Sequence, residues 1–503
     1  MKIDLGPVTR IEGHLNVHTT VENGIVTDAQ CVSEMFRGFE VILQGRDPLD
    51  AQQITQRICG VCPYAHAIAS SYAQENAYKL QVPPNGRIMH NLIQGANHLY
   101  DYLLQFYQLS ALDFVDVTAI LQYTGKDQDL IKVKQWVTAE LDRNKEFPAA
   151  PFLPRLSGQY IKDKDINIGA LKHYIEAMEI QKKANQAAAI FGGKFPHSTG
   201  IFPGGCTQNA RIDHIAAYQS LIREVKHFIH DKYIPDIVAV ATAFPEYWKI
   251  GASKGGFLSY GLLPLSSALN SKRLLAPGVM FDGQVSPVDL NQITQDTKFS
   301  KYSSSSNLHL KDSATIPAPH KNGAYSWTKA PRYGGRMVEV GPAARIMIDY
   351  HQGNNPVVTQ LVNHFAGLAK ITPANLNSVL GRHLSRAINA AVIADFLLEE
   401  TERLDHGGPT MADIVIPNSC EGFGMTEASR GGLLHYIRVE NHKIAKYECV
   451  VPTTWNGSPR DDNGQPGAME SALIGTKVQT PEEQIESVRI VHSFDPCIAC
   501  AVH

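Results

Sequence analysis

Two Cys-x-x-Cys pairs stand near opposite ends of this 503-residue chain, and they constrain its fold more than any other feature. The pairs are Cys59 with Cys62 and Cys497 with Cys500. A single pair of this kind fits a structural zinc site, a redox dithiol, an iron–sulfur site or ordinary packing. Together the two pairs offer four thiolates, which suit zinc, an iron–sulfur cluster or another soft metal.

The position of the pairs in the chain favours a metal that performs chemistry. Zinc ribbons usually bring their cysteine pairs together over a short stretch of sequence, whereas here almost the whole chain lies between Cys62 and Cys497. Closing so long a loop is an unusual way to stabilise a protein that has an ample core. We therefore expect the two ends of the chain to meet in the core around a buried metal.

The first cysteine pair is predicted to lie at the N-terminus of a helix. Pro63 suits the first helical position, which leaves Cys62 just outside the helix. The helix dipole and the free amides at such an end favour a thiolate over a thiol. His66 lies in the first helical turn, from which its imidazole can reach back to a thiolate sulfur or to a metal.

The second pair has a similar pattern. Asp495 is a good N-cap and Pro496 is a good first helical residue. Cys497 and Cys500 would then share one helix face. His503, three residues further on, would lie on the same face.

Composition excludes several classes of protein. Apolar residues make up 44% of the chain and charged residues 19%, so a large core is feasible and disorder is not expected. The net charge of -3 argues against a protein that binds nucleic acid through general positive charge. We expect no transmembrane helix, because no apolar run reaches about 18 residues. The first residues lack the apolar stretch of a signal peptide, so export would rely on something else.

Apolar spacing predicts a mainly helical α+β fold. An Asn-Gly turn at residues 23–24 predicts a hairpin of strands 14–21 and 25–33, and a second hairpin is expected over 434–439 and 444–451. Helical spacing covers the segments 88–112, 168–191, 212–240 (kinked by Pro235) and 376–404. We expect residues 1–503 to form a single composite domain with a central long-helix bundle and peripheral antiparallel β-hairpins.

Seven segments together resemble the large, catalytic subunit of nickel–iron hydrogenases. The two cysteine motifs, residues 57–62 with His66 and residues 495–503, match this family. Five further segments match it in family order: 10–14 (RIEGH), 37–40 (RGFE), 192–197 (GGKFPH), 430–433 (RGGL) and 450–456 (VVPTTWN). The resemblance covers essentially the whole chain. A related subunit of complex I shares the fold but has lost the nickel cysteines, all four of which are present here.

The resemblance implies reversible heterolytic cleavage of dihydrogen at a buried nickel–iron centre. Cys59 and Cys497 would be terminal nickel ligands, and Cys62 and Cys500 would bridge nickel to iron. The iron in this family carries carbon monoxide and cyanide, an Ni-Fe(CO)(CN)2 centre. Splitting dihydrogen requires a Lewis acid for the hydride and a base held close by.

The resemblance also assigns roles to polar residues around the centre. Arg430 matches an arginine that overhangs the open site, although an isolated arginine is more often a surface charge. Glu12 matches a proton-relay glutamate beside a terminal cysteine, although by itself it suggests an exposed strand carboxylate. The remaining matches are His66, a donor to a bridging sulfur; Thr453, a donor to a cyanide; and Asp101 and Asp495, acids near the pocket.

A second metal site and a partner are implied as well. Glu40, His503 and the backbone carbonyl of Cys449 match positions that hold Mg²⁺ or another divalent cation in relatives. Electrons would leave through a small subunit that carries iron–sulfur clusters, giving a heterodimer. Export through the signal of that subunit would place the chain in the periplasm or at the membrane, and a cytoplasmic location also fits. The ending at His503 resembles the processed form of the family.

Two residues depart from the family pattern, and two other functions remain open. Ser429 stands where relatives often have proline, and Phe195 replaces a common histidine. Some relatives use selenocysteine at the position of Cys497. A hydrogen-sensing regulatory relative would have the same site, and a non-enzymatic tetrathiolate zinc protein would have the same thiols.

Overall fold

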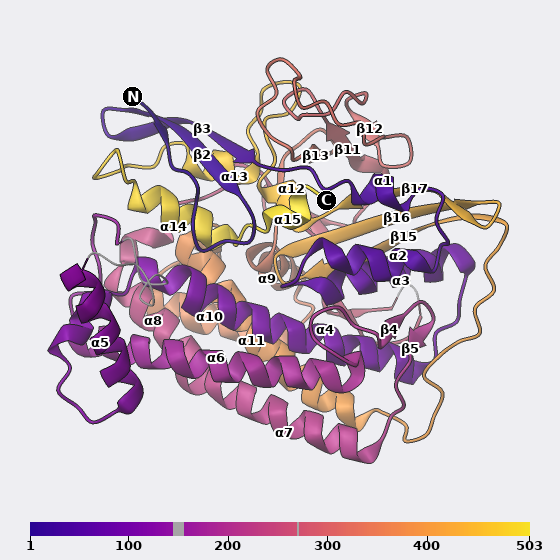
Figure 1. The fold of residues 1–503 in the computed structure, drawn as a ribbon, viewed down its shortest axis with the longest axis horizontal. Coiled ribbons are helices and arrows are strands. Elements are labelled where there is room, and N and C mark those ends of the chain that lie inside the picture. The colour runs from indigo at the N-terminus through magenta and orange to yellow at the C-terminus, as the bar shows by residue number, and fades with distance from the viewer. Residues whose placement is uncertain (144–154, 269–270) are drawn as a thin grey trace.

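Four long helices form one side of the molecule, in the lower half of Figure 1. The computed structural model describes residues 1–143, 155–268 and 271–503. The long helices are α4 (Pro84–Leu104), α6 (Lys164–Gly192), α7 (Ile212–Phe228) and α11 (Val379–Glu402). Helices α4 and α7 each pack against both α6 and α11. The four helical segments expected from apolar spacing are therefore present.

Two of these helices change geometry partway along the predicted segments. Helix α4 passes into a π-helix, η2 (Gln105–Ser110), and α7 passes into a second one, η6 (Ile229–Tyr233). Helix α8 (Ile234–Ala243) follows η6, with Pro235 in its first turn. Proline has no N–H for the helical ladder, so the interruption predicted there occurs as a π-helical turn.

The predicted N-terminal hairpin is confirmed. Strands β2 (Leu15–Glu22) and β3 (Ile25–Ser33) pair antiparallel, and β1 (Lys2–Asp4) adds to the edge of β2. Asn23 and Gly24 have φ values of 51° and 72°. Positive φ at both turn residues is the requirement of a type I′ hairpin, which explains why this dipeptide stands at the turn.

The second predicted hairpin belongs to a three-stranded sheet that is buried rather than peripheral. Its strands are β15 (Ser419–Ala428), β16 (Gly431–Glu440) and β17 (Lys443–Val450). Helix α3 (Pro63–Tyr78) packs directly on β15. A Cβ atom at Gly422 or Gly424 would overlap the carbonyl oxygens of Ala73 and Ala69 of that helix. The two glycines therefore permit the close approach that buries the sheet.

Short elements complete the fold. The other sheets have the strand orders β10 (Gln284–Ser286), β9 (Gly278–Phe281), β6 (Gly256–Ser259), β14 (Val338–Val340); β12 (Leu308–His309), β11 (Ile293–Asp296), β13 (Ala330–Tyr333); β4 (Ile201–Phe202), β5 (Gly205–Cys206); and β7 (Leu262–Pro264), β8 (Arg273–Leu275). The shorter helices are α1 (Phe39–Leu43), α2 (Asp50–Thr55), α5 (Gln128–Arg143), α9 (Pro342–Gln352), α10 (Pro356–Ala369), α12 (Pro452–Asn456), α13 (Ala468–Leu473), α14 (Ile485–Phe494) and α15 (Ile498–Ala501). Short 3₁₀ helices are η1 (Gln56–Ile58), η3 (Ala111–Asp113), η4 (Val117–Gln122), η7 (Pro245–Trp248), η8 (Leu290–Gln292) and η9 (Pro373–Leu376).

The last residues of the chain lie inside the molecule, against its first forty residues (Figure 1). Glu12 forms a parallel bridge with Cys497, in which the Ile498 N–H donates to the Glu12 carbonyl at 2.8 Å. The Arg37 N–H donates to the carbonyl of Val502 at 3.0 Å. Backbone hydrogen bonds thus join the two ends of the chain beside the cysteine pairs.

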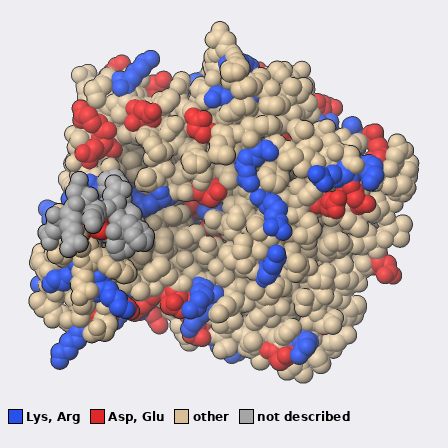
Figure 2. Space-filling view, viewed as in Figure 1, with Lys and Arg blue, Asp and Glu red and all other residues tan. Residues whose placement is uncertain are grey.

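The surface carries charges of both signs. On the face shown in Figure 2, small groups of Lys and Arg alternate with Asp and Glu on a mostly uncharged surface, apart from one short basic row. This distribution agrees with the net charge of -3. No helix among the described residues is long and apolar enough to cross a membrane.

Candidate metal centre

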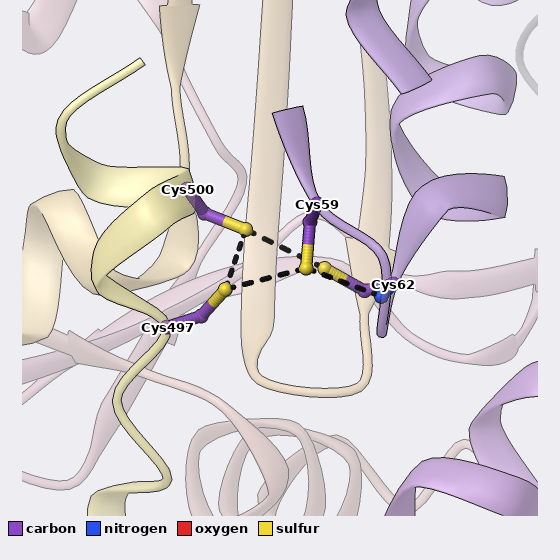
Figure 3. A group of neighbouring side chains, drawn as sticks. All are labelled: Cys59, Cys62, Cys497 and Cys500. Atoms are coloured by element: carbon purple, nitrogen blue, oxygen red, sulfur yellow. Dashed lines mark hydrogen bonds between the residues drawn. The ribbon is translucent and has the colours of Figure 1, made fainter. Parts of the chain in front are cut away.

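The four paired cysteines converge on one buried point between α3 and α15 (Figure 3). Their sulfur atoms all lie within 4.8 Å of one another. Cys59 Sγ lies 3.5 Å from Cys497 Sγ, and Cys62 Sγ lies 3.5 Å from Cys500 Sγ. Each side chain is at most 3% exposed, and none forms a disulfide. Four converging soft donors with no covalent partner fit a thiophilic metal ion.

The N-terminal pair is held by the start of α3. Cys62 is the N-cap of this helix and Pro63 its first residue, as the sequence predicts. The backbone N–H groups of Val61 and Cys62 donate to Cys59 Sγ at 3.3 and 3.4 Å. Hydrogen bonds from neighbouring thiols, above all Cys497, hold the pKa of Cys59 well below its usual value. This shift favours the thiolate form of the sulfur, which is the form that binds a metal cation.

The C-terminal pair departs from the prediction. Asp495 is not an N-cap; it lies at the C-terminal end of α14 with a left-handed φ of 57°. Helix α15 begins only at Ile498, and Cys497 is its N-cap. Aspartate tolerates the left-handed region, and its carboxylate is drawn to the Arg430 guanidinium, 3.1 Å away, instead of capping a helix.

Side chains from distant segments hold Cys497 in place. The Cys497 N–H donates to Thr453 Oγ1 at 3.0 Å. Its thiol lies 3.1 Å from Glu12 Oε2, which also accepts the N–H of Ala499 at 2.9 Å. Burial raises the pKa values of Cys497 and Cys500 well above the usual thiol range. These thiols therefore need a metal ion to stabilise their anionic form.

Arg430 lies between two carboxylates at the turn between β15 and β16. Its guanidinium contacts Asp101 on α4 at 2.8 and 3.1 Å and Asp495 at 3.1 Å. Arg430 is 2% exposed, which excludes the surface-charge interpretation. Burial raises the pKa of Asp101 to about 7, against the opposing effect of Arg430. The Ser429 hydroxyl also donates to Asp101, so this departure from the family pattern adds a polar contact.

Glu12 is the one carboxyl among these residues that contacts a thiol of the cluster. It is half-buried, and burial, followed by the charge of Cys59, raises its pKa. A carboxyl with a raised pKa beside a thiol is a better acceptor for the proton of that thiol than an ordinary carboxylate. The interpretation of Glu12 as an exposed strand carboxylate is wrong.

His66 lies in the first turn of α3 and is buried, and burial lowers its pKa to about 4. Its Nδ1 atom lies 3.2 Å from Nε2 of His435, whose Nδ1 lies 2.8 Å from the Tyr447 hydroxyl. Sequence reasoning missed His435 and Tyr447. The only sequence signal that could have indicated these two residues was a polar side chain on the face of each strand that was expected to be buried.

The residues predicted for a second metal site also lie together. His503 Nε2 lies 3.2 Å from Glu40 Oε1, and the same oxygen accepts the Cys449 N–H at 2.9 Å. His503 Nδ1 contacts the Cys500 carbonyl at 2.6 Å. If that nitrogen carries the ring proton, Nε2 presents a lone pair to the carboxylate. A cation between them would satisfy both.

Two residues that the sequence did not indicate complete this second cluster. The Lys329 ammonium lies 3.3 Å from Glu40 and 3.1 Å from Glu448, and all three side chains are buried. Burial raises the pKa of Glu40. Lys329 and His503 together lower the pKa by more than burial raises it, so the net shift is downward. Burial raises the pKa of Glu448 to about 7. A permanent anion at Glu40 suits a hard cation.

Fold and site together define a family. The model of the nickel-dependent hydrogenase family matches residues 37–503, and the chain belongs to this family.

Relatives and solved structures match the chain over its whole length. It is 36% identical to the periplasmic NiFeSe hydrogenase large subunit of Desulfomicrobium baculatum, covering 100% of this chain and 95% of the relative. It is 33% identical to the hydrogenase-2 large chain of Escherichia coli K12, covering 100% of this chain and 97% of the relative. The solved reduced NiFeSe hydrogenase of D. vulgaris Hildenborough superposes with a TM-score of 0.88 at 38% identity, covering 100% and 99% of the two chains.

Proposed function

We propose that the four converging thiols hold the nickel–iron centre at which this hydrogenase large subunit cleaves dihydrogen reversibly into protons and electrons. The single observation that carries the proposal is the convergence of four sulfur atoms within 4.8 Å, with a carboxyl oxygen 3.1 Å from one of them. Cys59 and Cys497 are proposed as terminal nickel ligands. Cys62 and Cys500 are proposed as bridges to iron. When bound, the centre supplies the Lewis acid that polarises dihydrogen.

Glu12 is proposed as the group that receives the proton. Its Oε2 atom lies within hydrogen-bonding distance of Cys497 Sγ, so a proton can pass from sulfur to oxygen without an intervening water. The Ala499 N–H binds the same oxygen and fixes its position. Because Glu12 is only half-buried, its carboxyl can pass protons from the buried thiols to the solvent.

Arg430 is proposed to stabilise charge beside the thiols. Asp101 and Asp495 hold its guanidinium by its terminal nitrogens, and its Nε atom has no hydrogen-bond partner among the described residues. A fixed, buried cation of this kind costs no reorganisation when charge develops nearby. We assign Asp101 and Asp495 the role of positioning Arg430.

The iron is proposed to carry carbon monoxide and cyanide. Thr453 Oγ1 accepts the Cys497 N–H, so its hydroxyl proton remains free to donate to a cyanide. His66, in the same pocket, would donate to a bridging sulfur. Glu40, His503 and the Cys449 carbonyl are proposed as ligands of Mg²⁺ or another divalent cation, with Lys329 and Glu448 beside it.

The partner is proposed to be a small subunit that carries iron–sulfur clusters and takes up the electrons. We propose a periplasmic location, or attachment to the membrane through that subunit, because the D. baculatum relative is named as periplasmic. We further propose that residues 1–503 act as one composite domain built on a central long-helix bundle, since the cysteine pairs from its two ends share one site.

The test is an infrared spectrum of the purified protein together with nickel, iron and zinc analysis. We expect sharp bands from iron-bound carbon monoxide and cyanide, and about one nickel per chain. Zinc in place of nickel, with no such bands in protein that has been matured with its partner, would overturn the proposal in favour of a tetrathiolate zinc protein.

A further inference from the structure

A hydrogen-bonded network of buried side chains ends at His66, and its other members have no part in the chemistry proposed above. His66 Nδ1 lies 3.2 Å from His435 Nε2 on β16, and His435 Nδ1 lies 2.8 Å from the hydroxyl of Tyr447 on β17. All three side chains are at most 1% exposed. With no carboxylate hydrogen-bonded to these rings in the described part of the chain, each imidazole holds a single proton.

The hydrogen-bonded network continues from Tyr447 back to α3. The hydroxyls of Ser70 and Thr55 lie within hydrogen-bonding reach of the Tyr447 hydroxyl, and Thr55 Oγ1 also donates to the Gln52 carbonyl at 3.4 Å. Gln74 Nε2 donates to Ser70 Oγ at 3.4 Å, and the Tyr78 hydroxyl donates to Gln74 Oε1 at 3.3 Å. Helix α3 therefore contributes the residues at both ends of this network, and the sheet contributes the residues in its middle.

The side chain of Gln74 indicates one direction of hydrogen-bond donation along this network. An amide oxygen can only accept a hydrogen bond, and an amide nitrogen can only donate one. Because Gln74 Nε2 donates to Ser70 Oγ, the proton of the Ser70 hydroxyl is free for the Tyr447 oxygen. In this arrangement the Tyr447 hydroxyl donates to His435 Nδ1, 2.8 Å away, in preference to Thr55 Oγ1.

This direction of donation would place the ring proton of each histidine on Nε2. His435 accepts at Nδ1, so its own proton lies on Nε2 and is donated to His66 Nδ1. His66 must then hold its proton on Nε2. That atom is the ring nitrogen left for the thiol cluster, because Nδ1 is occupied by His435.

We propose that His435 and Tyr447 are positioning residues that keep His66 as an Nε2–H donor toward the four-thiol site. The inference rests on the role proposed above for His66. The opposite tautomer would present a lone pair to anionic sulfur, which is repulsive. A partner that fixes the tautomer of a histidine at a metal site typically changes activity about 10- to 100-fold when removed.

Neutron diffraction from crystals of the perdeuterated protein tests the assignment directly. We expect deuterium on Nε2 of both His66 and His435, and none on Nδ1 of either. Deuterium on His66 Nδ1 would overturn the proposal. This result does not depend on which metal the thiols hold, so it is separate from the nickel and infrared measurements that test the proposed function.

Variants separate positioning from packing. His435→Gln keeps an N–H donor for His66, whereas His435→Leu has none. We expect hydrogen turnover to fall about 10- to 100-fold in His435→Leu and to stay within about threefold of the wild type in His435→Gln. Equal activity of the Leu variant and the wild type, at equal nickel content, would contradict the proposal.

A tyrosine pair in the same sheet provides a matched control. Tyr447→Phe removes the donor to His435, and we expect deuterium on His66 to spread over both ring nitrogens. Tyr436→Phe, on β16, removes only a hydrogen bond to Glu421, and we expect its deuterium positions to match the wild type. If deuterium stays on Nε2 of His66 in Tyr447→Phe, the hydrogen-bonded network does not set the tautomer.

Discussion

The N-terminal cysteine pair lies at the start of a helix of 16 residues, whereas the C-terminal pair lies at a helix of only 4 residues. Cys59 Sγ receives its backbone hydrogen bonds from Val61 and Cys62, within its own loop. Cys497 depends on Thr453 and Glu12, which are 44 and 485 positions away in the sequence. Two pairs with the same spacing are thus positioned by local structure in one case and by long-range contacts in the other.

The difference extends to the ionisation of the sulfur atoms. The pKa of Cys59 is held well below its usual value by hydrogen bonds from thiols, whereas burial raises the pKa of Cys497 well above it. The environment of Cys59 therefore favours the thiolate, whereas that of Cys497 favours the thiol until a metal binds. Substitutions around each pair test whether this contrast holds.

The largest effect is expected for Glu12→Gln, which acts on the C-terminal pair alone. The amide oxygen still accepts the Ala499 N–H, but the side chain no longer exchanges a proton with Cys497. Loss of a general base typically costs about 10²- to 10⁴-fold in rate. We expect hydrogen turnover to fall by that factor while nickel content stays at the wild-type level.

Glu22→Gln, an exposed position at the end of β2, is the matched control and should leave turnover unchanged. Turnover of Glu12→Gln within a factor of two of the control would show that protons leave the thiols by another route.

An intermediate effect is expected for Thr453→Val, which keeps the side-chain shape and removes the acceptor of the Cys497 N–H. Leaving a buried donor unpaired costs about 1–3 kcal/mol. We expect that loss in the free energy of unfolding, and faster release of nickel to a chelator. Thr454→Val is the neighbouring control, because the Thr454 hydroxyl is buried and has no hydrogen-bond partner among the residues that the structure describes. Equal losses in both variants would mean that Thr453 only fills space.

The smallest effect is expected for Pro63→Ala at the N-terminal pair. Proline in the first helical position restricts the unfolded chain, and its loss costs about 0.4–1 kcal/mol. Since Cys62 remains the N-cap of α3, nickel content should not change. Pro84→Ala, at the start of α4, is the control, and both variants should lower the thermal midpoint of unfolding by about the same number of degrees. Nickel loss in Pro63→Ala would show that the N-terminal pair is less firmly held by its helix than we conclude.

Elements with local signals could be predicted from the sequence. The Asn23-Gly24 turn, the long apolar helices and the start of α3 at Pro63 depend on neighbouring residues, and the structure contains them. Strand β15 was not predicted, because Gly422 and Gly424 weaken a strand pattern. Their role becomes visible only when α3 packs on them.

The site divides in the same way. The cysteines, Glu12 and Arg430 stand in motifs that the resemblance covers. Lys329 and Glu448 do not, because their charges meet only after β13 and β17 are brought together in the fold. Only the N-cap predicted at Asp495 was wrong, because aspartate suits both an N-cap and a left-handed turn, and a long-range ion pair with Arg430 decides between them.

The contact of α3 with the backbone of β15 has a consequence for electron transfer. Two glycines let the helix rest on the strand with no side chain between them, next to the turn that carries Arg430. A helix supported in this way cannot easily slide, so Cys62 at its N-terminus is held in place. For the proposed metal centre, a ligand that stays in place between oxidation states would keep the reorganisation energy low, which favours rapid exchange of electrons with the proposed partner.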